Sequence, residues 1–306
     1  MISLFVAALA AAALPMTAPG PHGPLSGTLV DAGKAAPVVL IIPGSGPTDR
    51  DGNNPMGVTA APYRLLAEAL AASGVSTLRA DKRGMFGSKS AIADPNAVTI
   101  ADYAADAHEW AEALRERTGA RCVWLLGHSE GGLIALAAAQ QPQGICGLIL
   151  VASPGRKLGA ILREQLQANP ANAPLLPQAL AAIGSLEAGN AVDVAGLPVP
   201  LLALFRPQVQ PFLIDLLKQD PRALVARTTM PVLIVQGGKD LQVSAADADA
   251  LHRARPDSQL LVVPKMNHVL KDVERDDRGS NLAVYADPSL PVDTILVGEI
   301  ARFVRR

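Results

Sequence analysis

Short apolar stretches alternate with longer amphipathic stretches along most of the chain. The short stretches predict buried strands, and apolar positions spaced three or four residues apart between them predict helices. Strands that alternate with helices are typical of a mostly parallel sheet with helices on both faces, so the fold class is α/β. The predicted strands cover residues 25–31, 36–42, 75–80, 123–127, 148–152, 231–236 and 259–263.

Local signals mark the ends of several helices. Residues 62–73 predict a helix that Gly74 ends, and Thr99 with Asp102 resembles a capping box at the start of a helix that Gly119 ends. At the C-terminus, Val292, Ile295, Leu296, Ile300, Phe303 and Val304 are spaced to bury one helix face. We find no internal repeat.

The buried strand at 123–127 breaks abruptly into a helix. Residues 127–131 read Gly-His-Ser-Glu-Gly, and an apolar helix-forming run follows. A serine on so sharp a strand-to-helix turn exposes its hydroxyl beyond the carboxyl end of the sheet. The turn needs small residues two positions before and after Ser129, which Gly127 and Gly131 provide. This pattern predicts a nucleophile elbow, a tight strand-to-helix turn that carries a nucleophilic serine, although a glycine-rich turn without chemistry would look similar.

A nucleophilic serine needs a base and an acid that orients it. His268 follows the predicted strand 259–263 after a short loop, and Asp240 follows the predicted strand 231–236. Both residues therefore lie at carboxyl ends of strands, and the order Ser129, Asp240, His268 is the one used by serine hydrolases with this elbow. The other histidines lie within helices, in the elbow itself or in the Pro/Gly-rich N-terminal stretch: His22, His108, His128 and His252.

A glycine-rich loop follows the strand 36–42. Gly44 and Gly46 flank Ser45, so the backbone can approach a ligand closely and present an N–H group. We predict an oxyanion hole made by the backbone N–H groups of Glu130 and of Ser45 or Gly46. The side chain of Glu130 is not needed for this role, and we expect it to form a salt bridge that packs the elbow.

The chain resembles bacterial α/β-hydrolases of the carboxylesterase type, within them the esterases that carry Gly-Ser-Gly-Pro-x-Asp-Arg-Asp-Gly after an early central strand. The matching segments are 44–53, 81–84, 127–132, 236–243 and 267–271. The resemblance implies an α/β-hydrolase fold and hydrolysis of a carboxylic ester through an acyl-serine intermediate, with no metal and no cofactor. The expected partner is a small-molecule ester substrate.

The pattern changes between residues 155 and 227, where helical segments rich in Ala, Leu and Gln are broken by prolines. We interpret 155–227 as a helical cap inserted into a core formed by 25–154 and 228–306. The apolar residues of the cap line an acyl pocket or simply pack the cap on the core, and both interpretations stay open: Leu201, Leu202, Phe205, Phe212 and Leu216.

Composition argues against several other classes of function. The chain has 306 residues, 49% of them hydrophobic, which suffices for one large domain or two small ones. A net charge of −1 and no cluster of Lys and Arg argue against nucleic-acid binding. No cluster of Cys, His or carboxylates has the spacing of metal ligands.

Residues 1–18 form an apolar run that is short for a membrane span and suits a secretory signal peptide. We therefore predict an exported protein, periplasmic or secreted, with cleavage after Ala18. If the segment is not a signal, the protein is cytoplasmic. No second apolar span follows, so an integral membrane protein is not expected.

The only two cysteines, Cys122 and Cys146, precede neighbouring strands that we expect to be parallel. Adjacent strands lie about 4.8 Å apart, and a disulfide accepts Cα separations of about 4.4–6.8 Å. Oxidation in an exported protein would join them, and two buried free thiols are an equally good interpretation.

Two other functions share these features. A thioesterase or an amide hydrolase uses the same triad and differs in its leaving-group pocket. A binding protein with a hydrolase fold and no catalysis would be expected to lack a triad residue, and this chain has all three.

Overall fold

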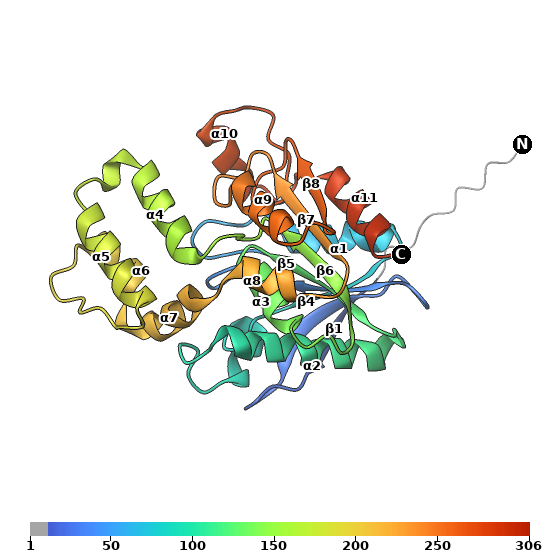
Figure 1. The fold of residues 1–306 in the computed structure, drawn as a ribbon. Helices are drawn as coiled ribbons and strands as arrows, with labels where there is room; N and C mark the ends of the chain where they lie inside the picture. The colour runs from blue at the N-terminus through green and yellow to red at the C-terminus, as the bar shows by residue number, and fades with distance from the viewer. Residues whose placement is uncertain (1–11) are drawn as a thin grey trace, which may run out of the picture.

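The computed structural model describes residues 12–306, and an eight-stranded sheet forms its centre (Figure 1). The strand order is β1-β2-β4-β3-β5-β6-β7-β8. The pairs β1–β2 and β2–β4 are antiparallel, and all other neighbours are parallel. The strands are β1 (Ala13–Ala18), β2 (Leu25–Val30), β3 (Val38–Ile42), β4 (Ser76–Ala80), β5 (Val123–His128), β6 (Ile145–Val151), β7 (Val232–Gly237) and β8 (Gln259–Val263). The predicted α/β class with a mostly parallel sheet is confirmed.

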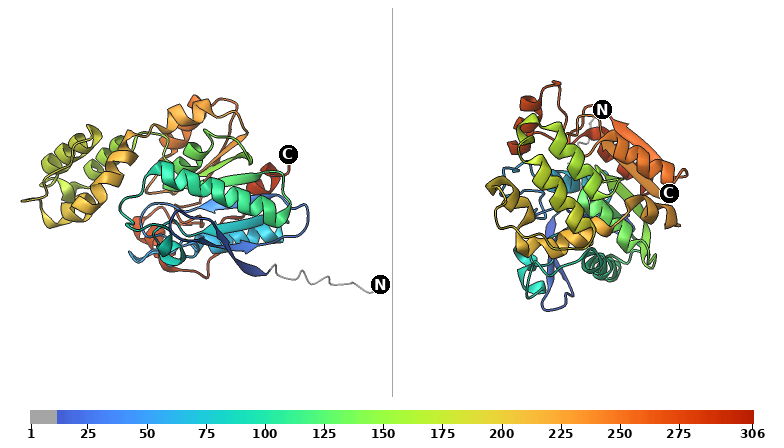
Figure 2. Two further views of the ribbon diagram at one scale, coloured as in Figure 1. Left: turned by 90° about the horizontal axis from the view of Figure 1, so that it is seen from below. Right: turned by 60° about the vertical axis from the view of Figure 1, so that its left-hand side comes forward.

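Helices cover both faces of the sheet (Figures 1 and 2). Helices α1 (Pro62–Ala72) and α11 (Thr294–Phe303) pack on one face, where Leu66 and Ile300 belong to the same apolar cluster as Ile41 of β3. The opposite face is covered by α2 (Ile100–Thr118), α3 (Glu130–Ala138), α8 (Pro221–Arg227) and α9 (Ala245–Ala254). Because both faces are covered, the central strands are buried along their whole length and read as continuous apolar runs.

Helix α2 begins and ends as the sequence predicts. The hydroxyl oxygen of Thr99 accepts a hydrogen bond from the Asp102 N–H, and the Asp102 carboxylate accepts one from the Thr99 N–H, so the capping box is complete. Gly119 ends the helix with φ 74°, a conformation that glycine adopts without strain.

The segment between β6 and β7 projects beyond the sheet as a helical lobe (Figure 2). It contains α4 (Leu158–Ala168), α5 (Leu176–Glu187), α6 (Val199–Phe205) and α7 (Gln210–Lys218), with short 3₁₀ turns at Pro170–Asn172 and Pro207–Val209. These helices share an apolar cluster of their own, which includes Ile183, Leu186 and Phe205. We call α4–α7 the cap. Helix α8, the last part of the predicted insertion, packs on α3 and α9 of the core.

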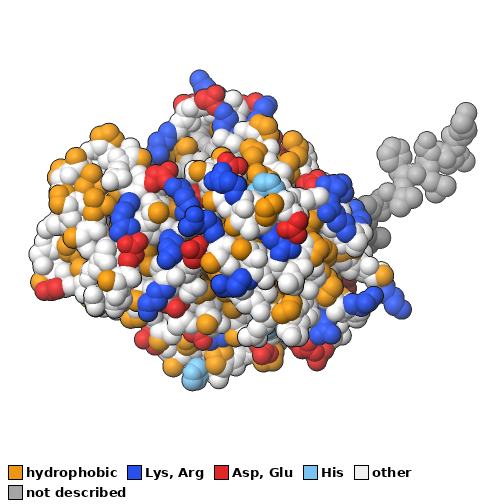
Figure 3. All heavy atoms as spheres, viewed as in Figure 1, with side chains coloured by type: hydrophobic (Ala, Val, Ile, Leu, Met, Phe, Trp, Pro, Cys, Tyr) orange, Lys and Arg blue, Asp and Glu red, His pale blue; other side chains and the backbone are white. Residues whose placement is uncertain are grey.

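The remaining short elements are α10 (Arg278–Ala283) and 3₁₀ turns at Phe86–Ala91 and Val284–Ala286. Charged side chains gather over the core and its junction with the cap, whereas the far end of the cap shows mostly hydrophobic and uncharged ones (Figure 3).

The segment that the sequence predicts as a signal peptide, residues 1–18, lies partly outside the described residues. Its last six residues form β1, an edge strand in which Ala13 lies opposite Val30 and Ala18 lies opposite Leu25. Cleavage after Ala18 would therefore remove β1, and it stays a prediction. Among residues 12–306, no helix has the length and apolar character that a membrane span requires.

Candidate active site

Ser129 lies between β5 and α3, in a strained turn. Its φ of 54° and ψ of −124° are rare for a residue with a side chain, and such strain is often found at functional sites. The flanking glycines permit the turn, because a Cβ on Gly127 would lie 2.2 Å from the carbonyl oxygen of Gly131. A Cβ on Gly131 would lie 2.2 Å from the carbonyl oxygen of Ile42. The turn therefore depends on glycine at both positions.

Asp240 and His268 lie in the loops that follow β7 and β8. The imidazole Nδ1 of His268 donates to Oδ2 of Asp240 over 2.8 Å. The other carboxylate oxygen, Oδ1, accepts from the N–H groups of Gln242 at 2.7 Å and Val243 at 3.0 Å. Since a carboxylate only accepts, Nδ1 carries the hydrogen and Nε2 is left as the basic nitrogen.

The same contacts govern the charge of Asp240. Burial raises the pKa of this carboxyl, but the charge of His268 and its hydrogen bond, with those from Val243 and Gln242, outweigh burial. The net effect is a pKa below the usual range, so Asp240 is ionised at neutral pH. An ionised carboxylate is the form that orients a histidine base.

A second buried carboxylate near the site is engaged elsewhere. Asp247, on α9, is buried and accepts hydrogen bonds from the Arg156 guanidinium at 2.8 and 3.0 Å and from the Ser244 hydroxyl at 2.9 Å. It therefore anchors the start of the cap to α9, and Asp240 is the carboxylate at His268.

Ser129 and His268 are brought to the same edge of the sheet without a direct hydrogen bond between the described side chains. His128, the residue before Ser129, connects them. Its ring lies 4.7 Å from the ring of His268, centroid to centroid, and its Nε2 donates to the His268 carbonyl oxygen over 2.9 Å. Catalytic hydrogen bonds of enzymes without substrate are often long or poorly aligned, so this arrangement is compatible with a triad.

The loop after β3 lies against Ser129. A Cβ on Gly44 would lie 3.2 Å from Cβ of Ser129, so the backbone passes directly beside the serine. Among residues 12–306, the N–H groups of Ser45, Gly46 and Glu130 donate to no other backbone carbonyl or side chain. All three residues and Ser129 line one cleft, where these N–H groups are free to bind an oxygen of a ligand.

Three consecutive charged residues after β4 each pair with a different segment of the site. Asp81 pairs with Arg50 at 2.5 Å, and Arg83 pairs with Asp106 of α2 at 2.5 Å. Lys82, between them, pairs with Glu130 at 3.1 Å. The predicted salt bridge of Glu130 is therefore present, and both of its side chains are buried.

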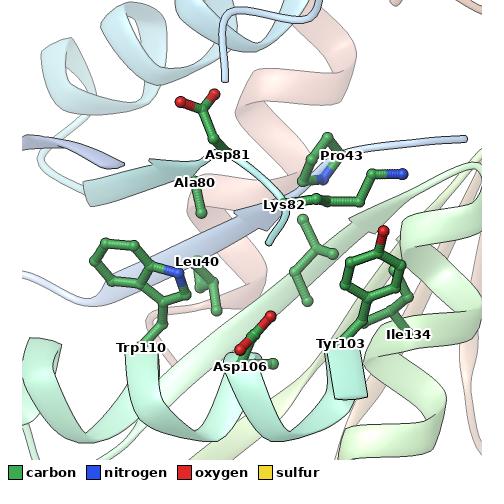
Figure 4. A pocket seen from close by; sticks show the side chains of 11 residues that line it. Leu40, Pro43, Ala80, Asp81, Lys82, Tyr103, Asp106, Trp110 and Ile134 are labelled. Carbon is green, nitrogen blue, oxygen red and sulfur yellow. The ribbon is translucent and has the colours of Figure 1, made fainter. Parts of the chain in front are cut away.

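Lys82 also holds the Gly44 peptide. Its Nζ donates to the Gly44 carbonyl oxygen over 2.8 Å. In a trans peptide the carbonyl and the next N–H point in opposite directions, so this bond sets the direction of the Ser45 N–H. In Figure 4 the Lys82 side chain extends toward Tyr103, whose ring centroid lies 5.3 Å from Nζ, beside a cavity of about 30 Å³ between β4 and α2.

The cleft between core and cap has a volume of about 560 Å³ and contains Ser129. Most of its cap side chains are apolar: Leu158, Ile161, Leu162, Leu204, Val209, Phe212, Leu213 and Leu216. Of the five cap residues considered for an acyl pocket, Phe212 and Leu216 line this cleft. Leu201 and Phe205 are buried in the interior of the cap, and Leu202 is half-buried outside the cleft. The cleft therefore suits a substrate with an apolar portion next to the serine.

The two cysteines lie near the amino ends of β5 and β6, at the other end of the strands from Ser129. The structure joins Cys122 and Cys146 by a disulfide, with Cα atoms 5.1 Å apart. The bond connects the start of β5, the strand that carries the elbow, to β6. Within the described part of the chain, no three side chains of His, Cys, Asp or Glu converge as metal ligands would.

Comparison with known proteins agrees with this architecture. A model of the alpha/beta hydrolase family matches residues 38–276, and the chain belongs to this family. It is similar to the esterase EstD of Thermotoga maritima, with 27% identity over 285 residues, 88% of this chain. The match spans 62% of that relative's length.

Solved structures share the fold at low sequence identity. An esterase of Pyrococcus furiosus has 16% identity and a TM-score of 0.57, over 97% of this chain and 93% of the other. Est1E of Butyrivibrio proteoclasticus has 18% identity and a TM-score of 0.59, over 95% and 98% of the two chains.

Proposed function

We propose that the protein is a carboxylesterase-type serine hydrolase, with Ser129 as nucleophile, His268 as base and Asp240 as the orienting acid. One observation carries the proposal. The Asp240–His268 hydrogen bond of 2.8 Å lies at the same sheet edge as a strained serine that opens into an apolar cleft. The similarity to a protein named esterase supports ester hydrolysis over other reactions of the family.

In the proposed mechanism, Ser129 Oγ attacks the ester carbonyl carbon while Nε2 of His268 takes the serine proton. The negative charge moves to the carbonyl oxygen, which the N–H groups of Glu130 and of Ser45 or Gly46 bind, each contributing about 3 kcal/mol. His268 then gives its proton to the departing alcohol, leaving an acyl-serine. Water, activated by the same imidazole, releases the acid and restores Ser129.

A fluorophosphonate probe tests the nucleophile directly. The purified protein should be labelled on the peptide that contains Ser129, and Ser129→Ala should not be labelled. A catalytically inactive binding protein would leave Ser129 unmodified. Short-chain p-nitrophenyl esters, acyl-CoA thioesters and peptide anilides, assayed side by side, then separate an esterase from a thioesterase or an amide hydrolase.

Export to the periplasm or the medium is part of the proposal, with residues 1–18 as the signal peptide. The Cys122–Cys146 disulfide supports it, because disulfides persist in oxidising compartments and are rare in the cytosol.

A further inference from the structure

A chain of buried hydrogen bonds starts in the glycine-rich loop after β3, which we call the oxyanion loop because it contains Ser45 and Gly46. The hydrogen bonds link this loop to the main chain of His268. The Gly44 N–H donates to the Tyr63 hydroxyl oxygen over 3.1 Å. The Tyr63 hydroxyl lies 2.7 Å from Nδ1 of His128, and Nε2 of His128 lies 2.9 Å from the carbonyl oxygen of His268. Tyr63 comes from α1 and His128 from β5, so the chain joins four separate segments of the core.

The donors and acceptors of this chain can be assigned in only one direction. The His268 carbonyl can only accept, so the hydrogen of the neutral His128 ring is on Nε2. Nδ1 is then an acceptor and takes the Tyr63 hydroxyl hydrogen, which leaves the Tyr63 oxygen to accept from Gly44. Every member is satisfied, and hydrogen bonds in such a chain strengthen one another in a buried site.

The protonation states keep this direction fixed. Burial, with the charge of His268, lowers the pKa of His128 to about 3, despite Asp240 nearby and the hydrogen bond to His268. Burial likewise raises the pKa of Tyr63 far above its usual value, against the opposing effect of the Gly44 N–H. His128 therefore stays neutral and Tyr63 stays protonated over the working range of an enzyme.

We propose that Tyr63 and His128 are positioning residues, which hold the oxyanion loop and the His268 main chain at the separation that the reaction requires. The inference rests on the proposed function, because it assigns the roles of Ser45 and His268 from it. Together with Lys82 on the Gly44 carbonyl, Tyr63 fixes both ends of Gly44. His128 in turn holds His268 through its backbone, while Asp240 holds the imidazole.

Kinetics of three variants test the proposal. Tyr63→Phe removes one oxygen and keeps the packed ring. His128→Gln keeps an N–H donor near the Nε2 position and loses the Nδ1 acceptor. Each should lower kcat for a p-nitrophenyl ester on the order of tenfold to a hundredfold, with KM little changed, because misplacement of the reacting groups penalises the transition state most. The double variant, Tyr63→Phe with His128→Gln, should have the same kcat as the less active single variant. Either substitution alone already interrupts the series of hydrogen bonds, so the second adds no further loss.

His108→Gln is the matched control, because Nε2 of His108 also contacts a backbone carbonyl, that of Ala138, at 3.1 Å. It should keep wild-type kcat. Wild-type kinetics for folded Tyr63→Phe, or single-variant losses that multiply in the double variant, would overturn the proposal. Absence of fluorophosphonate labelling in the wild type would instead refute the proposed function itself.

A measurement on the unaltered protein is independent of whether the variants fold. ¹⁵N NMR of the histidine rings should show His128 as the neutral Nε2–H form, unchanged between pH 5 and 9 (the window over which its pKa of about 3 keeps it uncharged). Titration of His128 within that window, or the Nδ1–H form, would break the assigned direction and overturn the proposal.

Discussion

Lys82 and Glu130 form a buried ion pair between the end of β4 and the elbow, with Nζ 3.1 Å from Oε1. The pair connects the two parts of the predicted oxyanion hole, because the same Nζ donates to the Gly44 carbonyl and Glu130 carries the N–H after Ser129. Removal of one charge would leave the other buried without a partner. We therefore expect such a substitution to lower the free energy of unfolding strongly.

We predict that Lys82→Met destabilises the fold by about 3–5 kcal/mol, the usual effect of breaking a buried pair from one side. Urea unfolding measures the change. Arg64→Met is the control, because Arg64 pairs with Glu68 in an exposed i,i+4 arrangement whose loss should stay within about 0.5 kcal/mol. Equal effects of the two substitutions would contradict the prediction.

Two aspartates near the site should respond differently to substitution. Asp240→Asn should lower kcat on the order of 10⁴-fold with little loss of stability, because the amide favours the wrong tautomer of His268. Asp247→Asn should chiefly lower the melting temperature, since Asp247 pairs with Arg156 and not with the base. The reverse pattern in kcat and melting temperature would mean that Asp240 is not the orienting acid.

The elements and the candidate site residues could be predicted from the sequence because their signals are local, whereas their role as a triad stays a prediction. Gly127 and Gly131 mark the elbow within five residues. Asp240 follows the buried strand β7, and His268 follows the apolar edge strand β8. The edge strand β1 has no such signal, since it forms the end of the apolar run 1–18, which is typical of a signal peptide.

The contacts of Tyr63, Lys82 and His128 could not be predicted for a different reason. Tyr63 lies 65 positions from His128, and His128 lies 140 from His268, so no local periodicity relates them. Tyr63 reads as one more residue on the buried face of a helix, and its contact with His128 depends on where the first turn of α1 lies relative to the end of β5. The glycines of the loop after β3 predicted a close backbone approach, and Gly44 does pass beside Ser129, but the sequence did not indicate that Lys82 holds the Gly44 peptide.

Two paired carboxyls, that of Asp272 in the loop after His268 and that of Asp293 at the start of α11, predict a dependence of stability on pH. The carboxyl of Asp272 is hydrogen-bonded to that of Asp293, and this bond, burial and the repulsion between the two raise the pKa of Asp272 to about 6. An acid with a raised pKa favours folding while it is protonated, so its contribution is complete below the unfolded value of about 3.8 and is lost as pH rises through about 6.

Asp272→Asn should therefore raise the melting temperature at pH 8, where the wild-type carboxyls repel, and change it little at pH 4. Thermal unfolding at the two pH values measures the difference. Asp249→Asn, at an exposed aspartate of α9, should show no such contrast. If Asp272→Asn raised the melting temperature equally at pH 4 and pH 8, ionisation of Asp272 would not be the cause of the stabilisation.

We predict that the disulfide stabilises the fold and does not contribute to activity. Cys122 and Cys146 are 24 residues apart, and closing a loop of this size stabilises a fold by about 3 kcal/mol in the chain-entropy model. Reduction should lower the melting temperature and leave kcat at room temperature unchanged, because the bond lies at the sheet edge opposite Ser129. Two titratable thiols in denatured, unreduced protein would show that the bond is absent.

The last prediction concerns the edge strand that signal-peptide cleavage would remove. Four of the six side chains of β1 are exposed and only Ala18 is buried, so β1 contributes little apolar burial to the fold. We therefore expect the chain that begins at Pro19 to fold and to keep the kcat of the full-length chain, with a lower melting temperature. N-terminal sequencing of exported protein should identify Pro19 as the first residue.

Loss of β1 leaves β2 as the edge strand, which could pair with other chains, so light scattering should accompany the assay to detect aggregation. If the shortened chain is insoluble, or the exported protein retains Ala13, then β1 is an integral part of the mature sheet and the cleavage site after Ala18 is wrong.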